Sequence, residues 1–492
     1  MARINTNVSS MIAQSNLARS NQDLTVRLQR LSTGLRINRG ADDPAGLIAS
    51  ERLRAEARGI GQAIRNSERA SSVIATTEGA LAEVADLLNS IKGLIVEASN
   101  SGGLSREEIE ANQLQIDSAI ESITRISNTA SFAGLQLLNG SLGYQTSVLP
   151  ATEIAGARIH SAAFNGNPTV PVSVEVISSA QTAQLFLSGN TAGAPGALLS
   201  SVTIEIAGNL GVTSLSFVSG TALSAVVAAV NAVKSATGVS ATLVDPADQT
   251  SGLVFNSTNY GSDQFVSVRK LGSGGEFFAV ADAPGGNIVN RDAGRDVAAI
   301  VNGSLARGKG LTVSTNTPTL AVELVLTRTF AQTLNTPASF DITGGGATFQ
   351  IGQAVTPTQQ VHLGIASIAA SQLGGTMIGD VRHFLDSLKT GGVNSLVAGS
   401  FENASKILDS AISEVAVTRG RLGAIERNTI DTTIRSLQVG LENITSSESK
   451  IRDADFAAET ANLTRSQILV QAGTSILATA NTTSQNVLAL LQ

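Results

Sequence analysis

The sequence predicts an α+β fold in which a discontinuous α-helical coiled-coil core, built from both chain termini, carries an inserted β-rich middle region. Apolar residues recur every seven positions over roughly the first 140 and the last 90 residues, as they do in coiled coils. Between these regions apolar and polar residues alternate, as in half-buried strands. Aromatic residues make up only 3% of the chain, so its cores must be packed mainly from aliphatic side chains.

The first expected helix runs from near the N-terminus to about Gly40. Leu17, Leu24 and Leu31 lie seven residues apart, so they share one face of a helix and form an apolar seam. Glycine is common just beyond a helix C-terminus, and Gly40 is interpreted as the stop.

Gly40, Asp42, Asp43 and Pro44 are interpreted as a joint that leads into a second helix. Asp43 is placed to cap it and Pro44 to occupy its first position. Adjacent carboxylates could also form an acid–base pair, but the proline directly after them favours capping. No comparable stop precedes about Asn100, so roughly 56 residues span on the order of 85 Å. The seam of this helix is Leu53, Ile60, Ile74, Leu81, Leu88 and Ile95, with Ser67 at the remaining position of the register.

A third helix is expected to open at the capping box formed by Ser105 and Glu108. Near the C-terminus, from about 402 to 448, a seven-residue repeat reaches Leu422 and resumes at Ile430, a step of eight that shifts the seam locally. The last segment has a seam of its own, Leu463, Val470, Leu477 and Leu491. Matching repeats at both ends predict that the terminal helices pair with each other.

Strands and turns are predicted between about 141 and 400. The clearest strands are VTIEIAG (202–208), SLSFVSG (214–220), GVSATLV (238–244) and FVSVRKL (265–271). One helix, ALSAVVAAVNAVKSATG, interrupts them, and Gly238 is its expected C-cap.

Composition excludes several classes of protein. The chain has no cysteine, which rules out disulfides, thiolate metal sites and cysteine nucleophiles. A net charge of -6 argues against nucleic acid as the main partner. No stretch approaches the roughly 18 apolar residues of a membrane-spanning helix, so no membrane insertion is expected. The N-terminus lacks the apolar core and cleavage site of a secretory signal peptide, so if the protein leaves the cell, a route that does not cleave its end is expected.

No catalytic, cofactor or metal site is predicted. GSLARGKG (303–310) matches the glycine and lysine positions of a P-loop, but Gly310 stands where Ser or Thr must bind magnesium, which favours a glycine-rich hairpin. His160, His362 and His383 are scattered without metal-ligand spacing. A structural or binding role is therefore expected instead of an enzyme.

Both ends of the chain resemble those of bacterial flagellins. The segments LQRLSTGLRINRGADDPAGLIASERLRAE (28–56) and ESKIRDADFAAETANLTRSQILVQAGTSILATANTTSQNVLALLQ (448–492) carry the resemblance, and SNTASFAGLQLLNG (127–140) resembles the end of the first helical half of that family. Residues 199–241 are similar to a repeat of flagellins and hook-associated proteins. Residues 347–375 resemble the point where flagellins re-enter the helical core.

The resemblance implies a subunit of an extracellular, self-assembling flagellar filament used for motility. It also implies partners, namely further copies of the chain, the flagellar export apparatus and its chaperone, the filament cap and hook-associated proteins. The implied division is an inner terminal-helix core (1–43 and 449–492), an outer helical core with short β segments (44–180 and 345–448) and a surface-exposed β-rich insert (181–344) containing the repeat (199–270).

Flagellins also carry a surface recognised by a Toll-like innate receptor. The corresponding positions here are Ser90, Leu94 and Gln115. Leu94 is retained, whereas Ser90 and Gln115 stand where the family has a key arginine and a helpful glutamate, so the resemblance implies only weak receptor contact.

Three alternatives remain open at this point. A hook-filament junction protein, which is a hook-associated protein, has similar ends. A phage fibre or surface adhesin has coiled coils made of parallel homotrimers instead of terminal helices paired within one chain. An enzyme hidden in the β insert would need a convergent polar cluster, which the sequence does not show.

Overall fold

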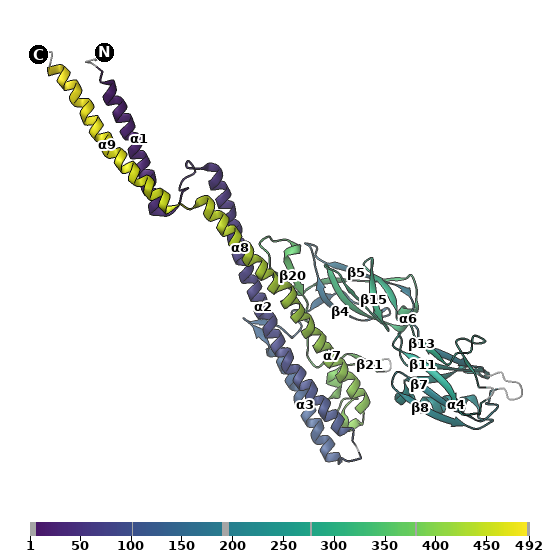
Figure 1. Ribbon diagram of the computed structural model, residues 1–492. Coiled ribbons are helices and arrows are strands. Elements are labelled where there is room, and N and C mark those ends of the chain that lie inside the picture. The colour runs from purple at the N-terminus through teal and green to yellow at the C-terminus, as the bar shows by residue number, and fades with distance from the viewer. Residues whose placement is uncertain (1–5, 101, 189–195, 276–277, 379–380, 490–492) are drawn as a thin grey trace. The chain divides into compact units, whose positions relative to one another are not determined.

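The computed structural model describes residues 6–100, 102–188, 196–275, 278–378 and 381–489, with the backbone alone at 249 and 483–489. The chain forms two compact units. One combines Met1–Ile74, Phe349–Gln360 and Leu422–Gln492, and the other combines Ala75–Thr348 and Val361–Arg421. Each unit thus draws on distant parts of the chain, and the N-terminal and C-terminal helices lie side by side (Figure 1).

Helices at both ends flank a β-rich middle, which confirms the predicted fold class. The described α-helices are α1 (Val8–Thr33), α2 (Pro44–Ala98), α3 (Arg106–Thr129), α4 (Leu223–Ala232), α5 (Lys234–Thr237), α6 (Arg328–Gln332), α7 (Phe401–Ile425), α8 (Asp431–Arg452) and α9 (Phe456–Ala489). The shorter helical turns are η1 (Pro357–Gln359), η2 (Leu385–Leu388), η3 (Leu396–Ala398) and the π-helical η4 (Glu426–Ile430).

The first helix ends earlier than predicted. α1 stops at Thr33, and Gly34 adopts the left-handed conformation (φ 73°), with its N–H donating to the carbonyl of Arg30. The assignment of the stop to Gly40 was wrong, because Gly40 lies in a turn between α1 and α2. Both glycines fit the sequence pattern of a helix end, and only the backbone geometry separates them.

The predicted starts of α2 and α3 are confirmed. Asp43 Oδ1 accepts the N–H of Gly46 at 2.9 Å, which caps α2 directly before Pro44. α2 runs for 55 residues and ends at Ala98. Ser105 and Glu108 form the reciprocal capping box at the start of α3, with Ser105 Oγ accepting the N–H of Glu108 and Glu108 Oε2 accepting the N–H of Ser105.

A π-turn takes up the step of eight in the C-terminal repeat. Leu422 and Ile430 are both buried, although eight residues separate them. Between them η4 inserts one extra residue into the helix, and the N–H of Asp431 donates to the carbonyl of Glu426, five residues back. Ser71 Oγ of α2 donates to Glu426 Oε1 at 2.6 Å, so the turn packs against α2.

One antiparallel sheet of eight strands forms the larger β body. Its core joins residues between Ile154 and Ala180 with residues between Val297 and Ile342. In spatial order the strands are β3 (Tyr144–Thr146), β18 (Pro337–Gly345), β5 (Val170–Ser178), β14 (Ala298–Val301), β15 (Ser304–Lys309), β16 (Thr312–Asn316), β17 (Leu320–Leu326) and β4 (Ile154–Ala162).

Two four-stranded antiparallel sheets and α4 share the core of the smaller β body. One sheet contains β12 (Val280–Ala281), β6 (Gln184–Leu187), β10 (Asp248–Ser257) and β9 (Val239–Asp245), and the other β13 (Arg291–Ala293), β11 (Phe265–Leu271), β7 (Val202–Gly208) and β8 (Val212–Phe217). All four clear strands predicted here are present, and Gly238 ends the helical segment with φ 75°.

The β bodies do not divide at residue 180. Strands β4 and β5 precede that residue and strands β14–β18 follow it, yet all of them belong to the eight-stranded sheet. The chain enters the smaller body from the larger one and returns, and Gln181 and Arg295 meet in an antiparallel bridge with two N–H···O bonds of 2.9 Å. Three two-stranded hairpins complete the described fold: β1 (Ser131–Phe132) with β2 (Leu135–Gln136), β19 (Ala347–Gln350) with β20 (Gln360–Leu363), and β21 (Thr376–Ile378) with β22 (Val381–His383).

Candidate assembly interface

The terminal helices α1 and α9 form an antiparallel pair. At one end Asn7 Nδ2 donates to the carbonyl of Ala480 at 3.0 Å, and Ser10 Oγ donates to Asn481 Oδ1 at 2.7 Å. Further along, a Cβ built on Gly473 would lie 3.2 Å from Leu17 Cδ1. The helices therefore approach closely at the seam residue Leu17, and the small residue at position 473 permits the approach.

A partly buried ion cluster closes the other end of the pair. The carboxylate of Glu459 lies 2.9 Å from Arg27 Nη1 and 3.0 Å from Arg30 Nη1. Burial alone would raise the pKa of Glu459, but hydrogen bonds and charges from the two arginines outweigh it and hold the pKa below its usual range. The ionised carboxylate thus fixes the alignment of α1 against α9. Sequence periodicity did not reveal this cluster, because charged residues fall outside the apolar repeat.

The joint next to this cluster is a short two-stranded contact. The N–H of Arg36 donates to the carbonyl of Arg452 at 2.7 Å, and the N–H of Ala454 donates to the carbonyl of Gly34 at 2.9 Å. Ile37 is completely buried in the connection between α1 and α2. The two chain segments therefore pass through the joint together. Sequence reasoning missed this contact, which has no local signal.

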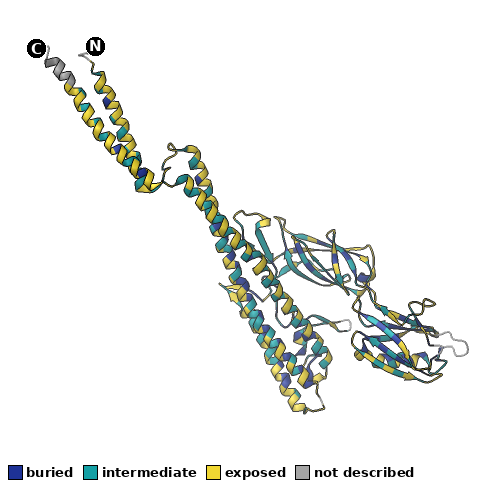
Figure 2. Ribbon diagram, viewed as in Figure 1, coloured by how far each residue is buried: buried dark blue, intermediate teal, exposed yellow. Residues whose placement is uncertain are grey.

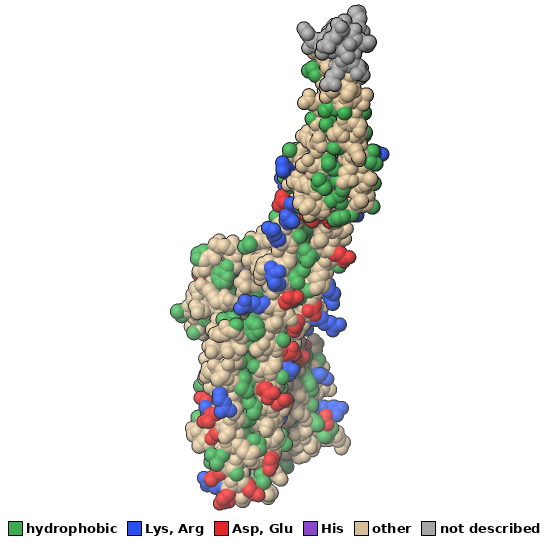
Figure 3. All heavy atoms as spheres, turned by 90° about the vertical axis from the view of Figure 1, so that its left-hand side faces the viewer, with side chains coloured by type: hydrophobic (Ala, Val, Ile, Leu, Met, Phe, Trp, Pro, Cys, Tyr) green, Lys and Arg blue, Asp and Glu red, His purple; other side chains and the backbone are tan. Residues whose placement is uncertain are grey.

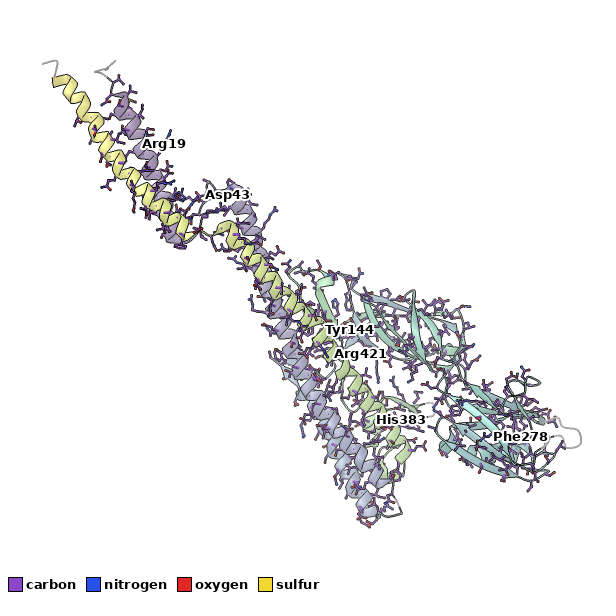
Figure 4. The ribbon with its side chains drawn as sticks, in the orientation of Figure 1. Arg19, Asp43, Tyr144, Phe278, His383 and Arg421 are labelled. Atoms are coloured by element: carbon purple, nitrogen blue, oxygen red, sulfur yellow. The ribbon has the colours of Figure 1, made fainter. Side chains whose placement is uncertain are left out.

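Two carboxylates accept hydrogen bonds in the rest of the segment that connects α1 to α2. Asp42 Oδ2 accepts the N–H groups of Arg39 and Asn38. Both hydrogen bonds lower the pKa of Asp42, and the bond from Arg39 has the larger effect. Asp43, labelled in Figure 4, caps α2. A Cβ on Gly46 would lie 2.8 Å from Ile37 Cδ1 and 2.4 Å from Asp43 Oδ2, so glycine is needed for this packing. Both carboxylates have structural partners, as the capping interpretation expects.

The predicted seam residues differ in burial between helices (Figure 2). On α2, five are buried: Ile60, Ile74, Leu81, Leu88 and Ile95. The others whose side chains are described are only half-buried: Leu17, Leu24, Leu31, Leu53, Leu463, Val470 and Leu477. Leu491 lies outside the described residues. In a single chain the terminal seam is therefore much less covered than the seam of α2.

Large apolar side chains face solvent on both terminal helices. Met11 and Ile12 on α1 are 62% and 57% exposed, and Ile468 and Ile476 on α9 are 62% and 60% exposed. Ala13 is the one apolar residue that the described part of this pair buries. Figure 3 shows hydrophobic side chains along the pair, with charged ones towards its lower end. Consistently, residues 8–18 and 466–482 contain no charged side chain.

An apolar surface of this kind on a helix pair is typical of an interface that is incomplete in one molecule. Comparison with known proteins agrees. The bacterial flagellin N-terminal helical region matches residues 4–142, the bacterial flagellin C-terminal helical region matches residues 405–491, and the flagellin hook IN motif matches residues 203–259. The B-type flagellin of Pseudomonas aeruginosa is 30% identical, and the alignment covers 99% of each chain.

This chain belongs to the bacterial flagellin family. It is a structural subunit of the flagellar filament that drives bacterial motility, and its place is the flagellum. The flagellin of Salmonella muenchen is 29% identical, again over 99% of each chain. A hook-associated protein 3 from Legionella pneumophila aligns at 13% identity over 82% of this chain and 98% of its own, with a TM-score of 0.30. That score is too low to support the junction-protein alternative.

Three residues of this flagellin mark the implied receptor surface. Ser90 on α2 and Gln115 on α3 are exposed, and Leu94, one turn from Ser90, is half-buried. All three side chains can be reached from solvent.

The remaining candidate sites of this flagellin are structural. GSLARGKG is strand β15 with Gly303 and Gly310 in left-handed turns at its ends, so it is not a P-loop. His160 Nε2 lies 3.9 Å from Glu323 Oε2, and no group of His, Asp and Glu among the described residues could hold a metal ion. Within the same residues no helix is long and apolar enough to cross a bilayer.

Proposed function

We propose that the α1–α9 pair is the surface through which this subunit polymerises, and that the pair becomes fully ordered only when neighbouring copies cover it. The observation that carries the proposal is the exposure of large apolar side chains on a pair that buries almost none of its own. Burying one such side chain, so that it is removed from water, stabilises the assembly by about 1.5–3 kcal/mol. A two-helix pair cannot provide that cover by itself, but neighbouring copies can.

The assembly is an open, head-to-tail homopolymer, because a contact between different faces that does not close into a ring continues as a helix. Its seam consists of the half-buried terminal residues together with the α2 residues that continue the register. Gly40, Asp42, Asp43 and Pro44 belong to the joint between the inner core (1–43 and 449–492) and the outer core (44–180 and 345–448). Residues 181–344 lie towards the filament surface, and the eight-stranded sheet links them to the outer core.

We extend the proposal with what the resemblance to flagellins implies. The subunit has no catalytic role, it is exported without a cleaved signal peptide, and it is extracellular. Its partners are the export apparatus and a chaperone before assembly, and the filament cap and hook-associated proteins afterwards. Nucleic acid and membrane lipid are not among its partners.

Electron microscopy of the purified protein with short filament seeds tests the polymerisation proposal. Limited proteolysis of the unassembled monomer accompanies it. We expect long filaments, and monomer cleavage confined to about the first and last 45 residues, since exposed helix pairs open locally. Protease-resistant ends together with an absence of filaments would contradict the proposal.

We also propose that this chain activates the Toll-like receptor only weakly. Ser90 cannot make the charge-assisted bonds of an arginine, and Gln115 lacks the charge of a glutamate. A reporter-cell assay with Ser90→Arg and Gln115→Glu, singly and together, tests this proposal. We expect a low response from the parent protein and a gain from the double variant. A strong parental response would contradict the proposal.

A further inference from the structure

We infer that Asn165 is a site of spontaneous deamidation, selected by the fold from three Asn-Gly pairs in the chain. The pairs are Asn139–Gly140, Asn165–Gly166 and Asn302–Gly303. Glycine after asparagine leaves the next backbone nitrogen unhindered, so all three pairs share the same local reactivity. What differs between them is how the structure holds each carboxamide.

The chemistry needs only water. The backbone nitrogen of Gly166 attacks Cγ of Asn165, the new C–N bond closes a five-membered succinimide, and the Cγ–Nδ2 bond breaks. The nitrogen leaves as ammonia and takes up the proton that Gly166 loses. Water then opens the ring at either carbonyl, which gives aspartate or isoaspartate. No oxidation or reduction occurs, and the residue gains one negative charge in either product.

Asn302 is held against this reaction. Its Oδ1 accepts the N–H of Ser173 at 2.8 Å, and its Nδ2 donates to the carbonyl of Pro171 at 2.8 Å. Asn302 and Gly303 also form the tight turn between the paired strands β14 and β15. For the Gly303 nitrogen to reach Cγ, both hydrogen bonds and the turn must give way.

Asn139 is restrained in a second way. Its Oδ1 accepts the N–H of Ser141 at 2.9 Å, which turns the carboxamide towards the following residues. Gly140 is confined as well, because a Cβ built on it would lie 3.2 Å from Ser367 Cβ. The backbone at this pair therefore has little room to rotate.

Asn165 has neither restraint. Its carboxamide makes no hydrogen bond to any described residue, and both Asn165 and Gly166 are exposed. They lie in the loop from β4 to β5, strands that pair with other strands and not with each other. One backbone bond closes the turn, from the N–H of Asn167 to the carbonyl of Phe164 at 2.8 Å. Both residues have positive φ, at 49° and 85°, as Asn302 and Gly303 also do. The backbone conformation therefore does not separate these two pairs, and the hydrogen bonds of the carboxamide do.

Peptide mapping of the native protein after incubation at mildly alkaline pH tests this inference. The three Asn-Gly peptides are compared with the same peptides from protein incubated in urea. We expect the Asn165 peptide to convert at nearly its denatured rate. The Asn302 peptide should convert more slowly than in urea, on the order of tenfold, because two hydrogen bonds must break first, and the Asn139 peptide should also be slowed.

Asn165→Gln is the matched variant, because its longer side chain cannot close the five-membered ring. In this variant, the main acidic species that the native protein forms during incubation should be absent on isoelectric focusing, and only the slower products of the other two pairs should remain. An Asn302 peptide that converts as fast as the Asn165 peptide in native protein, or an unmodified Asn165 peptide, would overturn the inference. The test uses unassembled protein, so its result is independent of the polymerisation proposal.

Discussion

At the residue scale, the terminal seam is the feature on which the proposed polymerisation depends. Leu17 packs against Gly473, yet Leu17, Leu24, Leu463 and Leu477 all remain half-buried. Their periodicity was visible in the sequence, because a seven-residue repeat is a property of the chain alone. Their incomplete burial was not, because it depends on which surfaces the fold brings to cover them.

We expect Leu477→Asp to abolish filament formation while both β bodies stay folded. A carboxylate at a seam that neighbouring copies cover loses its hydration without gaining a partner, at a cost of several kcal/mol. Seeded assembly and circular dichroism measure the two effects. Leu305→Asp is the control, since Leu305 is 72% exposed on β15. Normal filaments from Leu477→Asp would remove Leu477 from the seam.

At the scale of elements, the smaller β body is a continuous insertion whose ends meet. Gln181 and Arg295 form a two-bond bridge, and the core of the smaller body lies wholly between them. Residues 190–330 lie within the surface-exposed insert (181–344) that the resemblance implies, but they are not one removable piece. That segment includes β14–β17, four strands of the eight-stranded sheet, so such a deletion would remove half of the larger sheet.

We expect excision of residues 183–293, with Thr182 joined to Gly294 by a short glycine linker, to give a soluble, folded protein that still forms filaments. The bridge holds the two ends together, so closing the gap costs little loop entropy. Removing 190–330 should instead give aggregated protein. Gel filtration and electron microscopy separate the outcomes, and equal solubility of both deletions would contradict this division.

We also expect the extra residue of the π-turn η4 to be dispensable for stability. Deleting Asn428 places Leu422 and Ile430 seven residues apart, so an ordinary α-helix can present both to α2. We expect the free energy of unfolding to change by less than about 1 kcal/mol. Deleting Gln438 instead turns Ile444 and Ile451 off the seam, and should cost about 1–2 kcal/mol. Urea unfolding compares them, and a larger loss from the Asn428 deletion would show that the π-turn itself is needed.

At the scale of the whole molecule, a group of partly buried charges lies between the larger β body and α7. Arg158 Nη2 on β4 lies 2.8 Å from Glu414 Oε2 on α7, and Arg421 (labelled in Figure 4) faces the same group. Burial lowers the pKa of His160, and the proximity of the His160 ring, 3.9 Å away, lowers the pKa of Glu323. Burial raises the pKa of Glu414.

We expect acid to destabilise the protein in two stages. The depressed pKa of His160 contributes stability that is present above pH 6.5 and is lost as the pH falls through its folded pKa. The depressed pKa of Glu323 contributes stability that is present above pH 4.5 and is lost as the pH falls further, through its own folded pKa. Glu414, with its raised pKa, partly offsets the second stage. Burial also lowers the pKa of His362, so both histidines contribute to the first stage. Urea unfolding at several pH values measures the profile. His160→Gln should reduce the first stage and His160→Gln combined with His362→Gln should remove it; a first stage that persists unchanged in the double variant would contradict the assignment.

The sequence by itself determined the helical seams, the cap at Asp43, the capping box at Ser105, four strands of the smaller β body and the step at Ile430. All of these depend on residues close together in the chain. The tertiary structure decided which glycine ends α1, which strands share a sheet and how Glu459 joins Arg27 and Arg30. Those outcomes depend on contacts between residues far apart in sequence, whose free energies no local pattern contains.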